Sequence, residues 1–186
     1  MWIWEFSNFP AGTEPTPEQQ RTADEMVERS HEAAIRHGWA DVNQGIADGF
    51  ILPPQDHNHY RNDKYRLDDQ ILDPDHPEFL MYYPLDGEPK LAGFMFYTRS
   101  YEEHGPQFGG PLTLWHYHIW RDPHCMPWDL AKVTGECLEG EPSYRTPEMI
   151  HVWLVDRPEG SFATSMLILR ETLEAGLNKR MAERGY

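Results

Sequence analysis

The sequence is poor in basic residues and has no long apolar run. Its 186 residues include 16 Lys and Arg against 31 Asp and Glu, which gives a formal net charge of −15. An acidic surface of this kind repels the phosphates of nucleic acids and of anionic lipids, so we expect no nucleic-acid or membrane partner. No stretch of about 18 apolar residues occurs, so no membrane-spanning helix is expected.

Cysteine is also scarce. Cys125 and Cys137 are the only two, and they form either a disulfide or two free thiols. Two cysteines do not define a redox compartment. The first fifteen residues lack the basic start and the apolar centre of a secretory signal. The chain is therefore expected to be cytoplasmic as it stands, or exported if a signal peptide has been removed.

Motifs of several common enzyme classes are missing as well. The sequence contains no Gly-x-Gly-x-x-Gly, no phosphate-binding Gly-Lys-Ser/Thr loop and no Gly-x-Ser-x-Gly elbow. Dinucleotide binding, P-loop nucleotide hydrolysis and α/β-hydrolase chemistry are therefore poorly supported.

Local signals predict two helices near the beginning of the chain. Thr16, Pro17 and Gln19 form a capping box with proline in the first turn, and Gly38 is a typical helix end. A short second helix is predicted over residues 40–47. The next segment, from Gln55 to Pro77, is polar and is predicted to be a long loop.

Apolar and aromatic segments then predict strands, at residues 79–83, 90–98, 112–120 and 149–155. Asp86-Gly87 marks a hairpin turn between the first two. Residues 121–146 are expected to be irregular, with a helical turn near Asp129. Ser161 is the predicted cap of a last helix, whose apolar stripe comprises Phe162, Met166, Leu169, Leu173, Leu177 and Met181.

This order of elements predicts an α+β fold. We expect a mostly antiparallel sheet or half-barrel with an N-terminal and a C-terminal helix packed on it. The chain length suits a single domain over residues 1–186. Its expected parts are an extended arm (1–15), a helical region (16–50), a polar loop (51–77), a β-rich core for a metal site (78–160) and a C-terminal helix (161–186).

The placement of the histidines is the strongest functional signal. His57 and His59 form a His-x-His pair in the polar loop, His116 and His118 form a second pair in a predicted strand, and His151 lies in another. Residues two apart in a strand point to the same face, so His116 and His118 should project together. His151 would join them if the two strands are neighbours.

We therefore predict one transition-metal ion, bound by His116, His118 and His151 together with His57 or His59. Imidazole suits copper, zinc and iron, and the sequence does not distinguish them. Three histidines with an open position are typical of a reactive metal rather than a structural one. In the alternative interpretation His116 and His118 form hydrogen bonds within an aromatic core, while His57 and His59 are solvent-exposed.

Other polar residues are weaker candidates. Cys125 could supply a thiolate ligand, although a buried cysteine or a disulfide with Cys137 fits better. Four acidic residues could act as outer carboxylates or general bases, although each also fits an ordinary solvated acid: Asp56, Asp73, Glu78 and Glu148. Among the remaining histidines, His31 and His37 are expected on the surface, His76 at a turn, and His104 has no assigned role. No catalytic residue is predicted.

Three segments of the sequence resemble a family of bacterial proteins without an assigned activity. They are LDDQILDPDHPEFLMYYPLDGEPKLAGFMFY, FGGPLTLWHYHIW and MIHVWLVDRPEGSFA, within the region from His57 to Ala163. Members share a histidine near an asparagine and the motifs LDPxxPExLxY, GGPLTxWHxH and HVW…PxGxFA. The family's histidine positions match His59, His116, His118 and His151, and Cys125 lies near a cysteine often found there. The resemblance also implies export for many members, and it supports the site but not a reaction.

Three functions follow as hypotheses. The first is a mononuclear metalloenzyme that acts on a small molecule by Lewis-acid or redox chemistry. The second is a non-catalytic metal-binding or carrier protein, for which the eight methionines are a weak indication of copper(I). The third is a metal-free domain that binds a small molecule, with the histidines as hydrogen-bonding groups in its pocket. The oligomeric state is not predicted.

Overall fold

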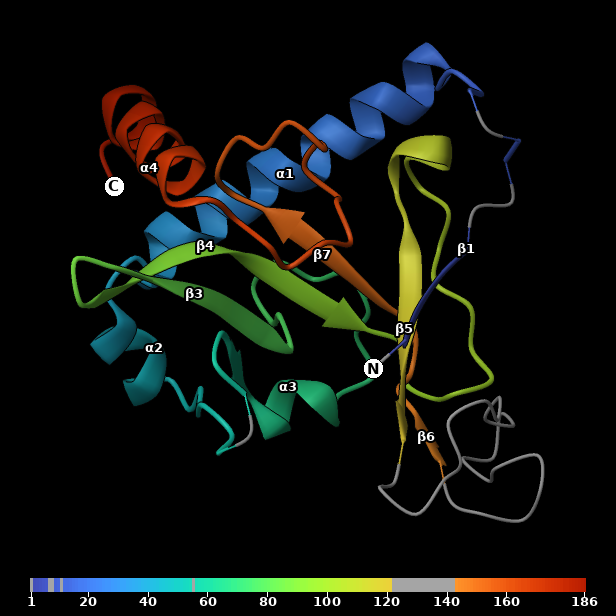
Figure 1. Cartoon of the computed structure of the whole chain (residues 1–186), viewed down its shortest axis with the longest axis horizontal. Coiled ribbons are helices and arrows are strands. Elements are labelled where there is room, and N and C mark those ends of the chain that lie inside the picture. Colours follow the sequence, from blue (N-terminus) through green and yellow to red (C-terminus); the bar gives the residue numbers. More distant parts are fainter. Residues whose placement is uncertain (1, 7–8, 11, 55, 122–142) are drawn as a thin grey trace.

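The protein is built on one curved antiparallel sheet with helices packed around it (Figure 1). The structure, a computed structural model, describes residues 2–6, 9–10, 12–54, 56–121 and 143–186. The strand order is β1-β5-β7-β4-β3-β2, and β6 pairs with the C-terminal end of β5. The strands are β1 (Trp2–Phe6), β2 (His59–Arg61), β3 (Phe79–Leu85), β4 (Glu88–Tyr97), β5 (Trp115–Arg121), β6 (Ser143–Arg145) and β7 (Met149–Trp153).

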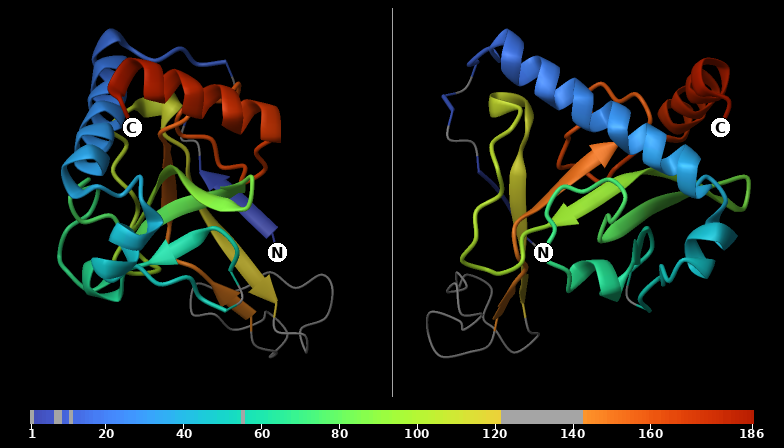
Figure 2. Two further views of the ribbon diagram at one scale, coloured as in Figure 1. Left: turned by 90° about the vertical axis from the view of Figure 1, so that its left-hand side faces the viewer. Right: turned by 180° about the vertical axis from the view of Figure 1, so that it is seen from behind.

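The helices are α1 (Pro17–His37), α2 (Val42–Ala47), α3 (Asp63–Arg66) and α4 (Arg170–Arg184), with a 3-10 turn η1 (Gly110–Leu112). Figure 2 shows α1 and α4 next to each other beside the sheet, and Arg184 of α4 donates hydrogen bonds to Glu28 of α1. The predicted α+β half-barrel with flanking N- and C-terminal helices is thus confirmed. No helix within the described residues has the length and apolar character needed to cross a membrane.

Local sequence signals account for α1 and for the β3-β4 hairpin. Thr16 and Gln19 form the predicted capping box, and Gly38 ends the helix with φ of 71°. Asp86 and Gly87 both have positive φ, 52° and 84°, as a two-residue turn matched to strand twist requires. These elements follow the prediction because their signals lie within a few residues of one another.

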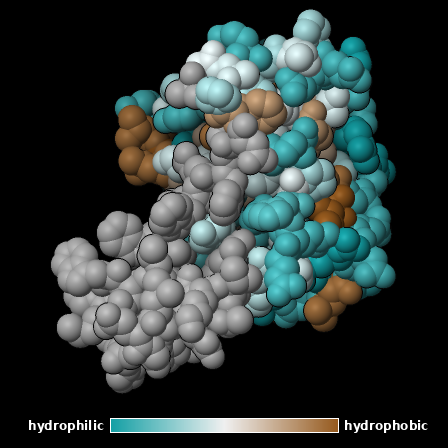
Figure 3. Space-filling model, turned by 90° about the vertical axis from the view of Figure 1, so that its right-hand side faces the viewer, coloured by the Kyte–Doolittle hydropathy of each residue, from teal (hydrophilic) through white to brown (hydrophobic). Residues whose placement is uncertain are grey.

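Alternation along the strands divides the core into two clusters. The first lies between the sheet and the first two helices and includes Ala23, Met26, Trp39, Phe50, Leu80, Tyr82, Phe94, Phe96, Trp115, Ile150 and Val152. The second lies on the opposite face and includes Phe79, Met81, Tyr83, Met95, Met149, Trp153, Val155, Ala163 and Leu173. On the face shown in Figure 3, the coloured residues are mostly hydrophilic with separate apolar patches, as expected for a chain of this charge.

The segment predicted as a long polar loop contains regular structure. Strand β2 pairs with β3 through His59, Tyr60 and Arg61, and α3 follows it with Asn62 as its cap. The prediction was wrong here because a three-residue edge strand is stabilised by its neighbour rather than by an apolar pattern of its own. The extended N-terminal arm similarly contributes β1, which pairs with β5.

The last helix begins at Arg170, not at Ser161. In the segment before it, the guanidinium of Arg157 donates to the carbonyls of Ser165 (2.7 Å) and Leu167 (3.0 Å). The hydroxyl of Tyr83 donates to the Met166 carbonyl at 2.8 Å. Because these carbonyls bond to distant side chains, residues 161–169 form an irregular strap across the second cluster. Of the predicted stripe on α4, Leu173 is buried, whereas Met181 is exposed.

Candidate metal centre

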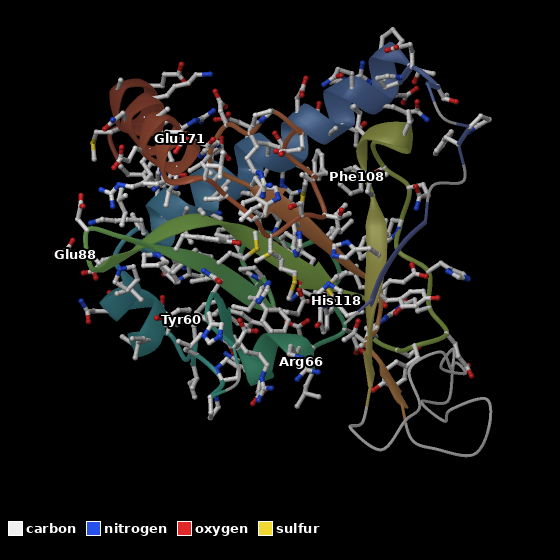
Figure 4. The ribbon with its side chains drawn as sticks, viewed as in Figure 1. Tyr60, Arg66, Glu88, Phe108, His118 and Glu171 are labelled. Atoms are coloured by element: carbon white, nitrogen blue, oxygen red, sulfur yellow. The ribbon has the colours of Figure 1, made fainter. Side chains whose placement is uncertain are left out.

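Four of the five predicted ligands lie together on the face of the sheet that carries the second cluster. The ring centroids of His116 and His151 are 4.8 Å apart, those of His116 and His118 are 5.5 Å apart, and those of His59 and His151 are 6.1 Å apart. The side chain of His118 extends from β5 toward this group (Figure 4). Residues far apart in the sequence thus bring their imidazoles to one place.

Strand geometry explains this arrangement. Trp115 points into the first cluster, so the alternating positions His116 and His118 face the other way. Strand β7 lies between β5 and β4, and His151 shares a side with Met149 and Trp153. His59 reaches the same side from β2 at the far edge of the sheet. The curvature of the half-barrel brings that edge toward β7.

The rings are deeply buried and leave polar atoms without partners. His116 and His151 are completely buried, and His118 is 6% exposed. The Nε2 atoms of His59, His116 and His151 have no hydrogen-bond partner within the described parts of the chain. An unsatisfied buried polar atom typically costs about 1–3 kcal/mol. Three such atoms therefore lie within one group of rings without partners among the described residues.

The other ring nitrogens of His116 and His151, the Nδ1 atoms, do have partners. Nδ1 of His151 donates to the carbonyl of Ala163 at 3.1 Å, and Nδ1 of His116 faces the carbonyl of Leu114 at 3.4 Å. A ring nitrogen that faces a carbonyl oxygen carries the proton, so Nε2 carries the lone pair. These two rings are held in the tautomer that a metal ligand needs.

Burial also keeps the imidazoles neutral. It lowers the pKa of His116 to about 3, with an added contribution from His118, and it lowers the pKa of His118 to about 4. The pKa of His151 lies well below its usual value, again mainly because of burial. Only a neutral imidazole can bind a metal, so His116, His118 and His151 are in the form that metal binding requires at neutral pH.

Asp56 fixes the orientation of His59. Its Oδ1 accepts the backbone N–H groups of His57 (2.7 Å), Asn58 (3.0 Å) and His59 (3.1 Å), and both of its oxygens lie 3.0 Å from Nδ1 of His59. Burial by itself would raise the pKa of Asp56, but the hydrogen bonds from His59 and the backbone outweigh it and lower that pKa. A carboxylate behind an imidazole is the usual outer partner of a metal-bound histidine.

A pocket of about 220 Å³ opens beside the group. His59 and His118 contribute to its wall, whereas His116 and His151 lie deeper. Its polar edge comprises Asp56, His57 and Asn58, and its apolar wall comprises Phe79, Met95, Tyr97, Met149 and Met166. The volume is below the ~300–1,000 Å³ of pockets for drug-sized ligands, so the pocket suits a smaller molecule.

Other predicted candidates lie elsewhere. His57 is exposed at the edge of the pocket and is not among the clustered rings. Asp73 bonds to His76 at 3.0 Å. Glu148 is buried and accepts from His104 (2.7 Å) and from the N–H of Gly105 (3.0 Å).

Glu78 and the cysteines complete the account of the candidates. Glu78 is buried, which raises its pKa to about 8, and it accepts the N–H of Tyr97 at 3.3 Å. Cys125 and Cys137 lie outside the described residues, as does the helical turn predicted near Asp129.

Two histidines expected on the surface have specific partners instead. His31 is buried, with Nδ1 2.5 Å from the hydroxyl of Tyr186, so the expectation of a surface position was wrong. His37 bonds to Asp75 at 2.8 Å and stacks on Trp39. The helical stripe alone did not reveal these contacts, because Tyr186, beyond the end of α4, reaches His31, and Asp75, from the segment before β3, reaches His37.

The separations of the imidazole rings are close to those of a metal centre, although the rings do not yet form one. Metal–nitrogen bonds of about 2.0–2.1 Å in a tetrahedral arrangement place neighbouring ring centroids about 5 Å apart. The observed separations of 4.8–6.1 Å bracket that value. Within the described residues, no three His, Cys, Asp or Glu side chains already converge as a formed metal site. Rotation of the side chains is what ligation would require.

No family model, no curated protein and no solved structure matches the chain. Function is therefore inferred from the chemistry of the site itself.

Proposed function

We propose that this protein binds one transition-metal ion through His59, His116, His118 and His151, and that it is a metal-dependent enzyme for a small molecule. The observation that carries the proposal is the set of buried Nε2 atoms of His59, His116 and His151 without hydrogen-bond partners among the described residues. These atoms come from three different strands and lie within one cluster of rings.

A shared ion explains these atoms better than a hydrogen-bonded core does. In such a core both nitrogens of each buried ring would have partners, since buried polar groups are nearly always satisfied. Here the Nδ1 atoms of His116 and His151 face carbonyl oxygens, and their Nε2 atoms are left over. A single ion would satisfy all of them, and the lowered pKa values of these rings favour the neutral form that binds it.

The pocket favours an enzyme over a carrier. His59 and His118 lie in its wall, so a molecule in the pocket would be adjacent to the ion. When bound, the ion would supply either Lewis-acid polarisation of a substrate oxygen or electron transfer. The protein's own part is to hold His59 through Asp56, to orient His151 through the Ala163 carbonyl, and to limit water with the apolar wall.

The direct test is metal content. Protein purified without an affinity tag, stripped with a chelator and reconstituted, should hold one equivalent of a transition metal. The H116A/H151A double variant should hold almost none. H76A is the control for metal taken up by histidines elsewhere, because His76 bonds to Asp73 and is not among the clustered rings.

Two outcomes would contradict the proposal. One is less than about a tenth of an equivalent of any transition metal in the reconstituted wild type. The other is unchanged metal content in H116A/H151A. Azide added to the copper(II)-loaded protein should shift its visible spectrum if a coordination position faces the pocket; copper(II) is used because copper(I) and zinc(II) have filled d shells and give no such bands. No shift, with metal bound, would favour a closed carrier site instead.

A further inference from the structure

Methionines lie directly opposite the clustered histidines in the sheet. Met81 on β3 is the cross-strand partner of His59, and Met95 on β4 is the cross-strand partner of His151. Met149 on β7 is the partner of His116 on β5. Directly opposed residues in an antiparallel pair have Cβ atoms about 4.5–5.5 Å apart, within reach of long side chains. Each of these imidazoles thus has a thioether as its neighbour on the same face.

The thioethers also gather at the pocket. Met95 and Met149 line it together with His59 and His118, and Met166 lines it from the strap. The strap is held there by the hydroxyl of Tyr83, which donates to the Met166 carbonyl and lies 3.7 Å from its sulfur. Three sulfur-bearing side chains from three parts of the chain therefore surround one opening beside the imidazoles.

The fourth methionine is accommodated by a glycine. A Cβ at position 93 would lie 2.7 Å from the terminal methyl of Met81 and 2.6 Å from the Val152 carbonyl. Gly93 thus leaves room for the Met81 side chain, which is completely buried beneath the site. Any larger residue at position 93 would displace Met81 or the neighbouring strand.

Sulfur and neutral nitrogen form a soft set of donors. Thioethers select copper(I), whereas carboxylate and carbonyl oxygens suit harder ions. Asp56, which supplies the one carboxylate among the described residues that line the pocket, is already engaged with His59 and three backbone N–H groups. Methionine also serves as an apolar filler, but leucine or isoleucine fills a core with better-defined rotamers.

We propose that the metal is copper, held as copper(I), and that Met95 and Met149 add thioether donors to the imidazoles. This inference rests on the proposed function, since it presupposes the histidine site. Met95 and Met149 are chosen because each lies opposite a clustered histidine and each also lines the pocket. Met166, which is less buried than Met95 and Met149, also lines the pocket but has no clustered histidine opposite it.

The test is a competition for copper(I) under anaerobic conditions, with bicinchoninate as the competing chelator. The wild type is compared with M95L, M149L and M95L/M149L, because methionine and leucine are similar in volume and exchange at little cost in stability. M26L is the matched control, since Met26 lies in the first cluster away from the site. Thermal unfolding of each variant verifies that it is folded.

The double variant should bind copper(I) at least about tenfold more weakly, which corresponds to about 1.4 kcal/mol. Its zinc(II) affinity and the copper(I) affinity of M26L should stay unchanged. X-ray absorption of the copper-loaded wild type should show sulfur in the first coordination shell, and M95L/M149L should lose it.

The failures of the two proposals can be told apart. Unchanged copper(I) affinity in M95L/M149L, with no sulfur scattering in the wild type, would overturn the thioether assignment and leave the histidine site intact. Failure of the wild type to bind either copper(I) or zinc(II) would overturn the histidine site itself. Weaker binding of both ions by M95L/M149L would show a general disturbance of the fold, and would also overturn the thioether assignment.

Discussion

The two faces of the sheet are built from the same strands but differ in whether their buried polar atoms have hydrogen-bond partners. On the face toward α1 and α2, the hydroxyl of Tyr82 donates to the Trp39 carbonyl at 2.7 Å, and Nε1 of Trp39 donates to Asp48 at 2.8 Å. On the opposite face, the Nε2 atoms of His116 and His151 have no partner within the described residues. The polar atoms of the first face are satisfied by folding alone, whereas on the second face the proposed metal ion would supply the missing partner.

The largest effect is expected from a substitution on the first face. Phe94 is completely buried there and contacts Trp39 and Phe96 edge to face. Phe94→Ala should lower the free energy of unfolding by about 3–5 kcal/mol, because it removes a large buried ring and leaves a cavity. Urea titration measures this, and the loss should be equal with and without metal. A loss confined to the metal-loaded protein would contradict the distinction between the faces.

A histidine of the second face should show the reverse pattern. His151→Ala should abolish the stabilisation by metal, which amounts to about 2.7 kcal/mol at a free metal concentration of 100 times the dissociation constant. The metal-free protein should lose less stability than it does in Phe94→Ala. Thermal unfolding with and without metal measures both. If the metal raised the melting temperature of His151→Ala as much as that of the wild type, His151 would not be a ligand.

The carboxylate behind His59 should have an intermediate effect. Asp56→Asn should weaken metal binding by about 10- to 100-fold, because the loss of an outer carboxylate frees the ring and lowers its basicity. Asp73→Asn is the matched control, since Asp73 holds His76 with the same sequence spacing and the same 3.0 Å separation. Metal titration compares them. Equal metal affinities in the two variants would show that Asp56 does not support metal binding.

Acid should lower the stability of the protein through buried histidines on both faces. Burial lowers the pKa of His31, beside α4, to about 4, and that of His118 to about 4. Both folded-state pKa values lie below the usual 6.5, so the unfolded chain binds more protons below that pH. Stability is then fully present above pH 6.5 and falls toward pH 4, by up to about 1.4 kcal/mol per pH unit for each group.

Urea titrations between pH 7 and pH 5 measure this slope. In the metal-free protein, His31→Gln should reduce the dependence of the free energy of unfolding on pH by the contribution of His31. Added metal should raise the stability at each pH but leave this slope as steep or steeper, because the ion holds the imidazoles unprotonated in the folded state while the unfolded chain still takes up protons. A slope that is indifferent to His31→Gln would show that the loss arises elsewhere.

Much of the fold was predictable because its signals are local. The Thr16 and Gln19 capping box, the Asp86-Gly87 turn and the alternation around His116 and His118 each depend on neighbours within a few residues. The same alternation placed two imidazoles on one face before any tertiary information was available. That is the part of the site that the sequence by itself determined.

Only the tertiary structure decided which strands are neighbours. The approach of His59 to His151, the carbonyl of Ala163 behind His151 and the cross-strand methionines all depend on the register and curvature of the sheet. The start of α4 was missed for the same reason, since Arg157 and Tyr83 hold the preceding strap through long-range hydrogen bonds. A local pattern specifies the direction of a side chain, but hydrogen bonds between distant segments specify what it meets.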